Sequence, residues 1–379
     1  MNVDNIRICR IASFPTEKSP GTGLPGYYLC KALKSPTLFL TRKTDTPLEV
    51  PTNVKLVTVR YPSPAFGRRI GPVTAVIKFL GLLKFLLASI GPLIRFRPDI
   101  VHIHSPLYLL HALFARLVLG SRICMTFHGS DLLRIKRSWI LKRFVARIAD
   151  LYFYVSISMR TDLEEFIPSG RLIHTPNGVD TTTFRDLGLK REKRVTAVGN
   201  LRWQKGYEYL IDAFSMLDHN GYSLVIVGDG PLRGDIQRRI DDAGLGARIT
   251  LLGRKDHGEI ADILNRSSIF VMSSVSEGFP KALVEAIASG LPVVTTDVGC
   301  CRELSNGVGL CVKPADADGL AGALDKLIRD DDMRNRFSQN TASAALRYSW
   351  DVSCETVGRA YGALISGGEG SEAPAPAHD

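Results

Sequence analysis

Short apolar runs alternate with longer segments of helical spacing along most of the chain, and this alternation predicts an α/β protein. The runs are continuously apolar and rich in Val and Ile, which is typical of strands buried on both faces of a parallel sheet. The predicted strands are 6–14, 37–41, 54–59, 99–104, 122–127, 151–156, 195–198, 224–227, 249–252, 269–272 and 293–295.

Helical spacing follows most of these strands, as at 207–217, so the predicted sheets are doubly wound. A turn and a charged stretch at 174–193 interrupt the pattern and mark a domain boundary. We therefore predict two Rossmann-like domains, at 1–175 and 176–366, with the last helix crossing back to the first domain. A disordered tail at 367–379 is predicted from its Gly, Pro and acidic residues.

Residues 66–97 form the most hydrophobic segment of the chain. Lys78, Lys84 and Arg95 interrupt it, so no unbroken apolar run approaches the ~18–20 residues that a membrane span needs. Two interpretations stay open at this point. The segment is either a partly buried helix of the first domain or an interfacial helix whose cationic edges contact a membrane.

The charge is divided unevenly along the chain, which carries a net +10. Residues 1–180 hold 25 Lys and Arg against 11 Asp and Glu, whereas residues 181–379 hold 23 against 27. A basic first half favours phosphorylated acceptors or a reversible contact with an anionic membrane. Nucleic acid is not expected as a partner, because no interleaved aromatic and basic pattern is present.

Cysteine spacing and the first residues bear on the cellular compartment. The seven cysteines have no paired spacing, so neither a zinc site nor a disulfide framework is predicted. The first residues run directly into a predicted strand with no signal peptide. We therefore expect a cytoplasmic protein, which the basic first half would let associate with the inner face of the membrane.

The segment 274–290, SVSEGFPKALVEAIASG, carries the strongest candidate chemistry. Pro280 suits the first turn of a helix, whose N–H groups attract phosphate. Glu285 lies about 7–8 Å further along that helix, a distance that suits a carboxylate binding the ribose of the same nucleotide. Glu277, on the preceding loop, would face the group carried by the distal phosphate, and Gly278 permits close approach or positive φ. A surface helix with solvated glutamates explains the spacing equally well.

Other candidates follow predicted strands, where ligands gather in parallel sheets. Gly21 and Gly23 follow the first strand, but their spacing is not a dinucleotide fingerprint, so no nicotinamide or flavin site is predicted. A plain flexible loop explains them as well as a ligand loop does. His128 and Asp131 follow the strand at 122–127. A lone histidine is more often structural than functional.

The second half resembles glycosyltransferase family 4, the retaining nucleotide-sugar enzymes of GT-B fold. The matching motifs are NGVD (177–180), KG (205–206), VGDGPL (227–232), LLG (251–253), EGFPKALVEAIASGLPVV (277–294) and TDVG (296–299). The first half matches more thinly, through the glycine loop, DIVHIHSP (99–106) and TFHGSD (126–131). The resemblance implies two facing Rossmann-like domains with the active site in the cleft between them.

The resemblance also implies roles for particular residues. Glu277 would face the donor sugar, Lys205 would neutralise the diphosphate, and His128 would lie near the transferred sugar. In the family an arginine that neutralises the diphosphate usually follows the first glycine of the loop at 199–206. Asn200 holds that position in this chain, so Arg202 is the substitute candidate. The donor-binding residues implied are Glu285, Gly278, Phe279, Pro280, Lys281, Gly228, Arg254 and Asn200. The acceptor-binding residues implied are Gly21, Gly23 and Asp131.

These implications lead to a predicted hexosyltransferase that acts on a glycan or lipid-linked glycan in surface polysaccharide biosynthesis. Neither a metal nor another cofactor is expected, because Lys205, Arg202 and a helix start would supply the positive charge that the leaving diphosphate needs. Two alternatives stay open. One is an enzyme of this fold with a soluble acceptor, such as a sucrose or trehalose-type synthase. The other is a non-catalytic nucleotide-sugar binder.

Overall fold

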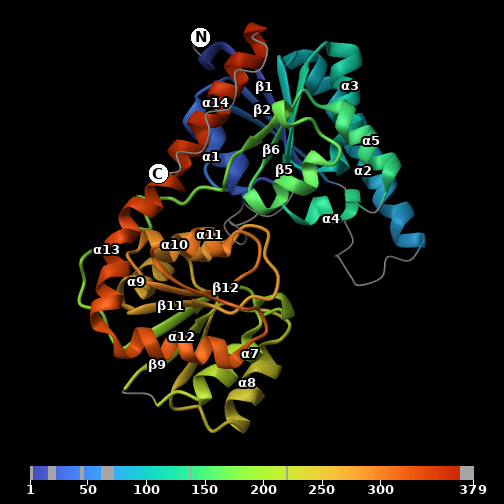
Figure 1. The fold of residues 1–379 in the computed structure, drawn as a ribbon. Helices are drawn as coiled ribbons and strands as arrows, with labels where there is room; N and C mark the ends of the chain where they lie inside the picture. The colour runs from blue at the N-terminus through green and yellow to red at the C-terminus, as the bar shows by residue number, and fades with distance from the viewer. Residues whose placement is uncertain are drawn as a thin grey trace. The chain divides into compact units, whose positions relative to one another are not determined.

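Buried runs of Val, Ile and Leu form two separate parallel sheets (Figure 1). The computed structural model describes residues 3–15, 23–42, 47–60, 72–136, 138–218 and 221–367, so the predicted tail beyond Gly367 lies outside the described residues. The chain divides into a first unit, Met1–Pro176 with Ser353–Asp379, and a second unit, Asn177–Val352.

The sheet of the first unit has seven parallel strands in the order β3-β2-β1-β4-β5-β6-β7. Its strands are β1 (Ile8–Ile11), β2 (Thr37–Arg42), β3 (Val54–Val59), β4 (Ile100–Ile103), β5 (Arg122–Phe127), β6 (Leu151–Tyr154) and β7 (Leu172–His174). Its helices are α1 (Leu24–Leu33), α2 (Pro72–Phe96), α3 (Leu109–Leu119), α4 (Ser130–Lys136), α5 (Trp139–Ile148), α6 (Arg160–Glu164) and α14 (Trp350–Ser366).

The sheet of the second unit has six parallel strands in the equivalent order, β10-β9-β8-β11-β12-β13. Its strands are β8 (Arg194–Val198), β9 (Ser223–Val227), β10 (Ile249–Gly253), β11 (Ile269–Met272), β12 (Val293–Thr296) and β13 (Gly309–Val312). Its helices are α7 (Tyr207–Ser215), α8 (Arg233–Asp242), α9 (His257–Arg266), α10 (Lys281–Ala288), α11 (Cys301–Ser305), α12 (Ala317–Arg329) and α13 (Asp331–Arg347).

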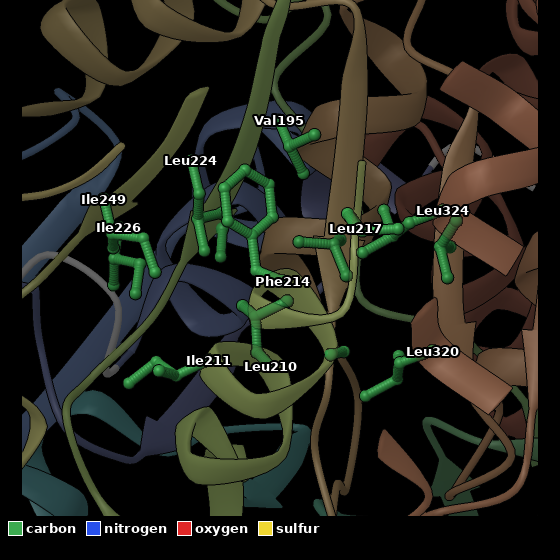
Figure 2. Packing of buried hydrophobic residues seen from close by; sticks show 14 of the residues in the cluster. Val195, Leu210, Ile211, Phe214, Leu217, Leu224, Ile226, Ile249, Leu320 and Leu324 are labelled. Atoms are coloured by element: carbon green, nitrogen blue, oxygen red, sulfur yellow. The ribbon is translucent and has the colours of Figure 1, made fainter. Parts of the chain in front are cut away.

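Helices α7 and α12 share one core with the second sheet. Phe214 of α7 and Leu324 of α12 are fully buried in one cluster with Leu224 and Ile226 of β9, and Figure 2 shows Phe214 beside Leu224. Removing such side chains from water stabilises the fold by about 1.5–3 kcal/mol each. This core fixes the strands whose carboxyl ends carry the candidate site.

The last helix belongs to the first unit, although the second unit precedes it in sequence. The predicted second domain ended at residue 366, whereas the second unit ends at Val352. Val357 and Tyr361 of α14 are buried against Ile8 and Ile100 of the first sheet. The apolar face of α14 therefore completes the first core.

Candidate active site

In the second sheet, β8 and β11 are neighbours in space, and the direction in which successive strands are added reverses between them. The chain continues from β8 toward β9 and β10 on one side, and from β11 toward β12 and β13 on the other. Loops leaving the carboxyl ends of two such strands diverge, and the space between them is the usual ligand site of an open parallel sheet. The loops here are 199–206 and 273–280.

Opposite charges from these two loops form a direct ion pair. The Lys205 Nζ donates to Glu277 Oε1 over 2.6 Å, and the Ser274 hydroxyl donates to the same oxygen over 2.6 Å. The Glu277 side chain is 10% exposed and the Lys205 side chain 22%, so both are held close to the protein. The structure thus brings together two residues that lie 72 positions apart. Ser274 was missed in the sequence, where a serine in a loop carries no distinctive pattern.

Backbone contacts hold the two loops together beneath this pair. The Ser273 hydroxyl donates to the Lys205 carbonyl over 2.9 Å, and the Val275 N–H donates to the Gln204 carbonyl over 2.8 Å. The Tyr207 hydroxyl donates to the Gly199 carbonyl over 3.1 Å. These bonds fix the Lys205 backbone directly, so the ammonium position does not depend on its flexible side chain alone.

Gly228 is required where it stands because of close backbone approach. Its φ is 141°, and a Cβ at this position would lie 1.9 Å from the Gly199 carbonyl oxygen. Its N–H donates to the Gly253 carbonyl over 2.8 Å. The predicted donor-binding glycine is therefore explained by contact between loops, and a ligand role for it stays a prediction.

Glu285 lies on the half-buried face of α10, one turn beyond Lys281. Burial raises the pKa of the Glu285 carboxyl to about 7, against the opposing charges of Lys281 and Lys205. Burial also lowers the pKa of Lys281, and Glu285 opposes that shift. The charge of Lys205 therefore acts on both predicted glutamates, Glu277 by contact and Glu285 through space.

The start of α10 differs from the prediction, because Pro280 precedes the helix and does not stand in its first turn. Gly278 does not have a positive φ, so of its two predicted roles only close approach to a ligand stays a prediction. The N–H groups of Lys281 and Leu283 donate to the carbonyls of Phe279 and Pro280, over 3.1 and 3.0 Å. The helix start thus offers fewer unpaired donors to a phosphate than the sequence predicts, because the turn before it folds back onto them.

The remaining predicted donor residues are less closely placed. Arg202 is exposed, has no ion-pair partner within the described residues, and precedes the 3₁₀ turn Trp203–Lys205. Asn200 is exposed, and its carbonyl accepts the Arg202 N–H over 2.8 Å. Arg254 is exposed and follows β10, which lies two strands away from β8.

The predicted acceptor residues belong to the first unit. Gly21 lies outside the described residues. Gly23 has φ 102° before α1, and its Cβ would lie 2.3 Å from the Ser13 carbonyl oxygen, so the backbone itself requires glycine there. Asp131 is buried near the start of α4. The ring of His128 contacts the ring of His104 after β4, a partner that sequence spacing did not identify.

Two family descriptions match adjoining parts of the chain. Residues 36–183 match "Glycosyltransferase Family 4", and residues 179–344 match "Glycosyl transferases group 1". The first match covers six of the seven strands of the first sheet, and the second covers the whole second sheet together with Lys205, Glu277 and Glu285.

Individual proteins agree with these matches. An uncharacterised glycosyltransferase of Methanocaldococcus jannaschii is 30% identical over 62% of this chain and 67% of its own. An Escherichia coli galactosyltransferase, named for transfer from UDP-Gal to α-D-GlcNAc-diphosphoundecaprenol, is 29% identical over 68% of this chain and 73% of its own. The solved sucrose-phosphate synthase of Thermosynechococcus elongatus superposes with a TM-score of 0.77 at 21% identity, over 96% of this chain and 100% of that one. The chain is therefore a member of glycosyltransferase family 4 with the GT-B fold.

Proposed function

We propose that this glycosyltransferase moves a hexose, with retention of configuration, from a nucleoside diphosphate sugar to a lipid-linked glycan in bacterial-type surface polysaccharide biosynthesis. The observation that carries the proposal is the Lys205–Glu277 ion pair at the carboxyl ends of β8 and β11. An ammonium beside a carboxylate at this point suits a ligand with an anionic diphosphate at one end and sugar hydroxyls at the other.

The chemistry needs positive charge where the sugar–phosphate bond breaks. Lys205 and the exposed Arg202 would stabilise the diphosphate as it leaves, so we expect no requirement for a divalent cation. Glu277 would hold the sugar hydroxyls and position the sugar for attack on the face that the diphosphate vacates, which gives retention. In this assignment neither carboxylate acts as a nucleophile.

The acceptor class is supported by the named reaction of the Escherichia coli relative, whose acceptor is a lipid diphosphate. The structural likeness to sucrose-phosphate synthase keeps a soluble acceptor as the second candidate. The intact set Lys205, Glu277 and Glu285 speaks against a non-catalytic binder, because a binder needs no charge aimed at a leaving group.

The donor and the acceptor are tested together on the purified chain. UDP, GDP and ADP sugars are screened by thermal shift, and a ligand at a hundredfold excess over its Kd should stabilise the protein by about 2.7 kcal/mol. Radiolabelled transfer is then measured to a polyprenyl-diphosphate sugar and to hexose phosphates, with and without EDTA, and NMR assigns the product anomer. Transfer only to a hexose phosphate would establish the second candidate, and stabilisation without transfer or hydrolysis would establish a binder.

A membrane contact is part of this proposal, because a lipid-linked acceptor lies at a bilayer surface. Val76–Phe96 of α2 is long and apolar enough to cross a membrane by length and composition alone, which corrects the prediction that its apolar runs are too short for a span. Phe85, Ser89 and Leu93 lie at four-residue spacing on one face and are buried in the first unit. A span would have to pull this face out of the core, so a peripheral position is favoured.

The opposite face of α2 continues onto two further helices. Helix α3 contacts both α2 and α5, and all three lie along one edge of the first unit in Figure 1. Large apolar side chains are exposed on all of them, with Leu117 74% and Trp139 73% exposed. These helices contain seven Lys and Arg and no Asp or Glu. A cationic apolar surface repels a second copy of itself and attracts anionic lipid.

Neutralising three exposed cations of this surface, Lys84, Arg143 and Arg147, to glutamine should release the protein from anionic vesicles. Each basic residue near such a surface contributes up to about 1 kcal/mol, so partitioning should fall roughly a hundredfold at low salt. Vesicle co-sedimentation across a salt series measures this. Binding of the unchanged protein should itself weaken as salt is added.

The matched control neutralises three exposed cations of the second unit, Arg238, Lys326 and Arg347, and should leave partitioning unchanged. A loss equal to that of the first triple variant would show that net charge alone drives binding. Equal partitioning onto neutral and anionic vesicles, or none onto either, would contradict the membrane contact and favour a soluble acceptor. Arg68 and Arg69, which lie within the hydrophobic segment 66–97, are outside the described residues.

A further inference from the structure

Gly199, directly after β8, lies against the side chain of Lys205. A Cβ at Gly199 would be 3.0 Å from Lys205 Cε and 3.4 Å from Lys205 Cδ. Two carbon atoms pack best at roughly 3.5–4.0 Å, so the lysine stem uses room that any larger residue at position 199 would fill. The φ of Gly199 lies outside the left-handed region, so backbone strain does not require glycine there. The close approach of the lysine stem does.

The hydroxyl of Tyr207 lies against the same glycine. It would be 3.1 Å from a Cβ at Gly199, and it donates to the Gly199 carbonyl over 3.1 Å. Tyr207 is the first residue of α7 and only 3% exposed. Burial raises the pKa of its hydroxyl, and the charge of Glu277 raises that pKa further, so the hydroxyl keeps the hydrogen that it donates. Helix α7 therefore holds the Gly199 peptide through a neutral donor.

The neighbouring strand β9 restrains the same peptide. The Gly199 N–H donates to the Val227 carbonyl over 2.9 Å. The Cβ that Gly228 lacks would lie 1.9 Å from the Gly199 carbonyl oxygen, so the two backbones already touch. Movement of Gly199 toward β9 is thus closed. A side chain added at position 199 would have to displace the Lys205 stem or the Tyr207 hydroxyl.

Lys205 is fixed at both ends of its side chain. Its carbonyl accepts the Ser273 hydroxyl over 2.9 Å, which fixes the backbone end. Its Nζ donates to Glu277 Oε1 over 2.6 Å, which fixes the ammonium. The stem passes Gly199 between these two points. A stem pushed away from Gly199 would therefore carry the ammonium away from Glu277.

We propose that Gly199 and Tyr207 are positioning residues that aim the Lys205 ammonium at Glu277 and at the leaving diphosphate. Gly199 supplies the room for the lysine stem, and Tyr207 holds the peptide against which that stem lies. The kinetic consequence rests on the proposed function, because the ammonium acts on a diphosphate only if a nucleotide sugar is the donor. The position of the ammonium itself exists without substrate.

Gly199→Ala should lower kcat about 3- to 10-fold and leave nucleotide Kd within about twofold. The added methyl group moves the lysine stem by a few tenths of an ångström, and a misplacement of about 1 Å costs up to about 100-fold. Gly246→Ala is the matched control, because a Cβ there meets nothing within 4 Å, and it should keep full kcat. An unchanged kcat in Gly199→Ala would overturn the proposal.

A double-mutant cycle tests whether the loss acts through the lysine. In a Lys205→Ala background no stem remains to be displaced, so Gly199→Ala should cause no further fall in single-turnover rate. Independent sites show losses that multiply, whereas residues that act through one contact do not. Losses that multiply in the double variant would mean that Gly199 acts without Lys205, which contradicts the assigned role.

Tyr207→Phe removes the hydroxyl and keeps the buried ring. We expect kcat to fall about 3- to 10-fold, and the fall should again vanish in the Lys205→Ala background. Tyr222→Phe, which alters another buried tyrosine of the same core, should leave kcat unchanged. A lower Tm of Tyr207→Phe together with an unchanged kcat would mean that the hydroxyl only stabilises the fold.

The position of the ammonium is read without substrate from trace acetylation by acetic anhydride, with mass spectrometry of the peptides. Lys205 should react slowly relative to exposed Lys326, since its side chain is 22% exposed and its ammonium is bound to a carboxylate. The ratio should rise in Gly199→Ala and in Tyr207→Phe, as it should in Glu277→Gln, which removes the charged partner. An unchanged ratio in both positioning variants would overturn the proposal. If the unchanged protein transfers no sugar, the proposed function fails, while the acetylation ratios still decide whether Gly199 and Tyr207 hold Lys205.

Discussion

Replacing Lys205 by alanine is expected to lower kcat about 100- to 1,000-fold, with a much smaller change in nucleotide affinity. Negative charge on the diphosphate grows as the sugar–phosphate bond breaks, so a cation there acts more strongly on the transition state than on the bound donor. The ammonium lies 2.6 Å from Glu277, inside the protein, where water screens it poorly. Its loss also leaves Ser274 as the one remaining hydrogen-bond donor to Glu277 Oε1 within the described residues.

Single-turnover kinetics and calorimetry separate the two effects. Lys326→Ala, which truncates an exposed lysine of α12, should leave both kcat and Kd unchanged. A variant of Lys205 with a raised KM and an unchanged kcat would show that this lysine serves only donor binding. Arg202→Ala is measured in parallel, because Arg202 is the second cation assigned to the leaving group.

Replacing Glu285 by glutamine should weaken nucleotide binding about 10- to 100-fold, since a charged hydrogen-bond partner of the ribose contributes about 1.5–3 kcal/mol. The pKa of Glu285 is about 7 in the free protein, because burial disfavours the carboxylate. Below pH 7 the carboxyl is increasingly protonated, so nucleotide affinity should fall between pH 8 and pH 6. Calorimetry at several pH values should show this fall in the unchanged protein and not in the variant.

Deprotonation of the Glu285 carboxyl, which favours nucleotide binding, destabilises the folded protein without nucleotide. Its pKa is raised on folding, so the stability it contributes is complete below its ordinary pKa and is lost as the pH rises toward 7. Above pH 7 the buried carboxylate costs the folded state up to about 3 kcal/mol. Glu285→Gln should therefore raise the Tm of the nucleotide-free protein at pH 8. Unchanged affinity for every nucleoside diphosphate would sink the ribose assignment, and Glu355→Gln on an exposed position of α14 is the control.

Both sheets could be predicted from the sequence, because a strand that is buried on both faces consists of consecutive apolar residues. Every predicted strand has a counterpart, and β3, β5 and β11 match to the residue. Two edge strands were missed. β7 has three residues, and β13 begins with glycine and is half-exposed throughout, so neither carries such a run. The strand order within each sheet was not predicted, because an apolar run does not state which strands are its neighbours.

The candidate site was predictable in part. Glu277 and Glu285 stand in one motif, but no local pattern states that Lys205 pairs with Glu277, since that contact depends on β8 and β11 being neighbours. The turn before α10 could not be predicted either. In it, the carbonyls of Phe279 and Pro280 accept hydrogen bonds from N–H groups at the helix start, and no local sequence pattern indicates these bonds. The contact between the rings of His104 and His128 needs β4 and β5 to be neighbours, so the sequence identified His128 as a candidate without its partner.

The position of α14 determines the order in which the chain can mature on the ribosome. The second unit ends at Val352 and is fully synthesised while the rest of α14 is still being translated. The first unit waits for that helix, whose Val357 and Tyr361 fill its core. At about 5–20 residues per second, synthesis from Pro176, where the first segment of this unit ends, to the end of α14 takes on the order of tens of seconds. During it, the core positions that α14 will cover stay open to solvent and to chaperones, so the N-terminal half of the chain is the last to complete its fold.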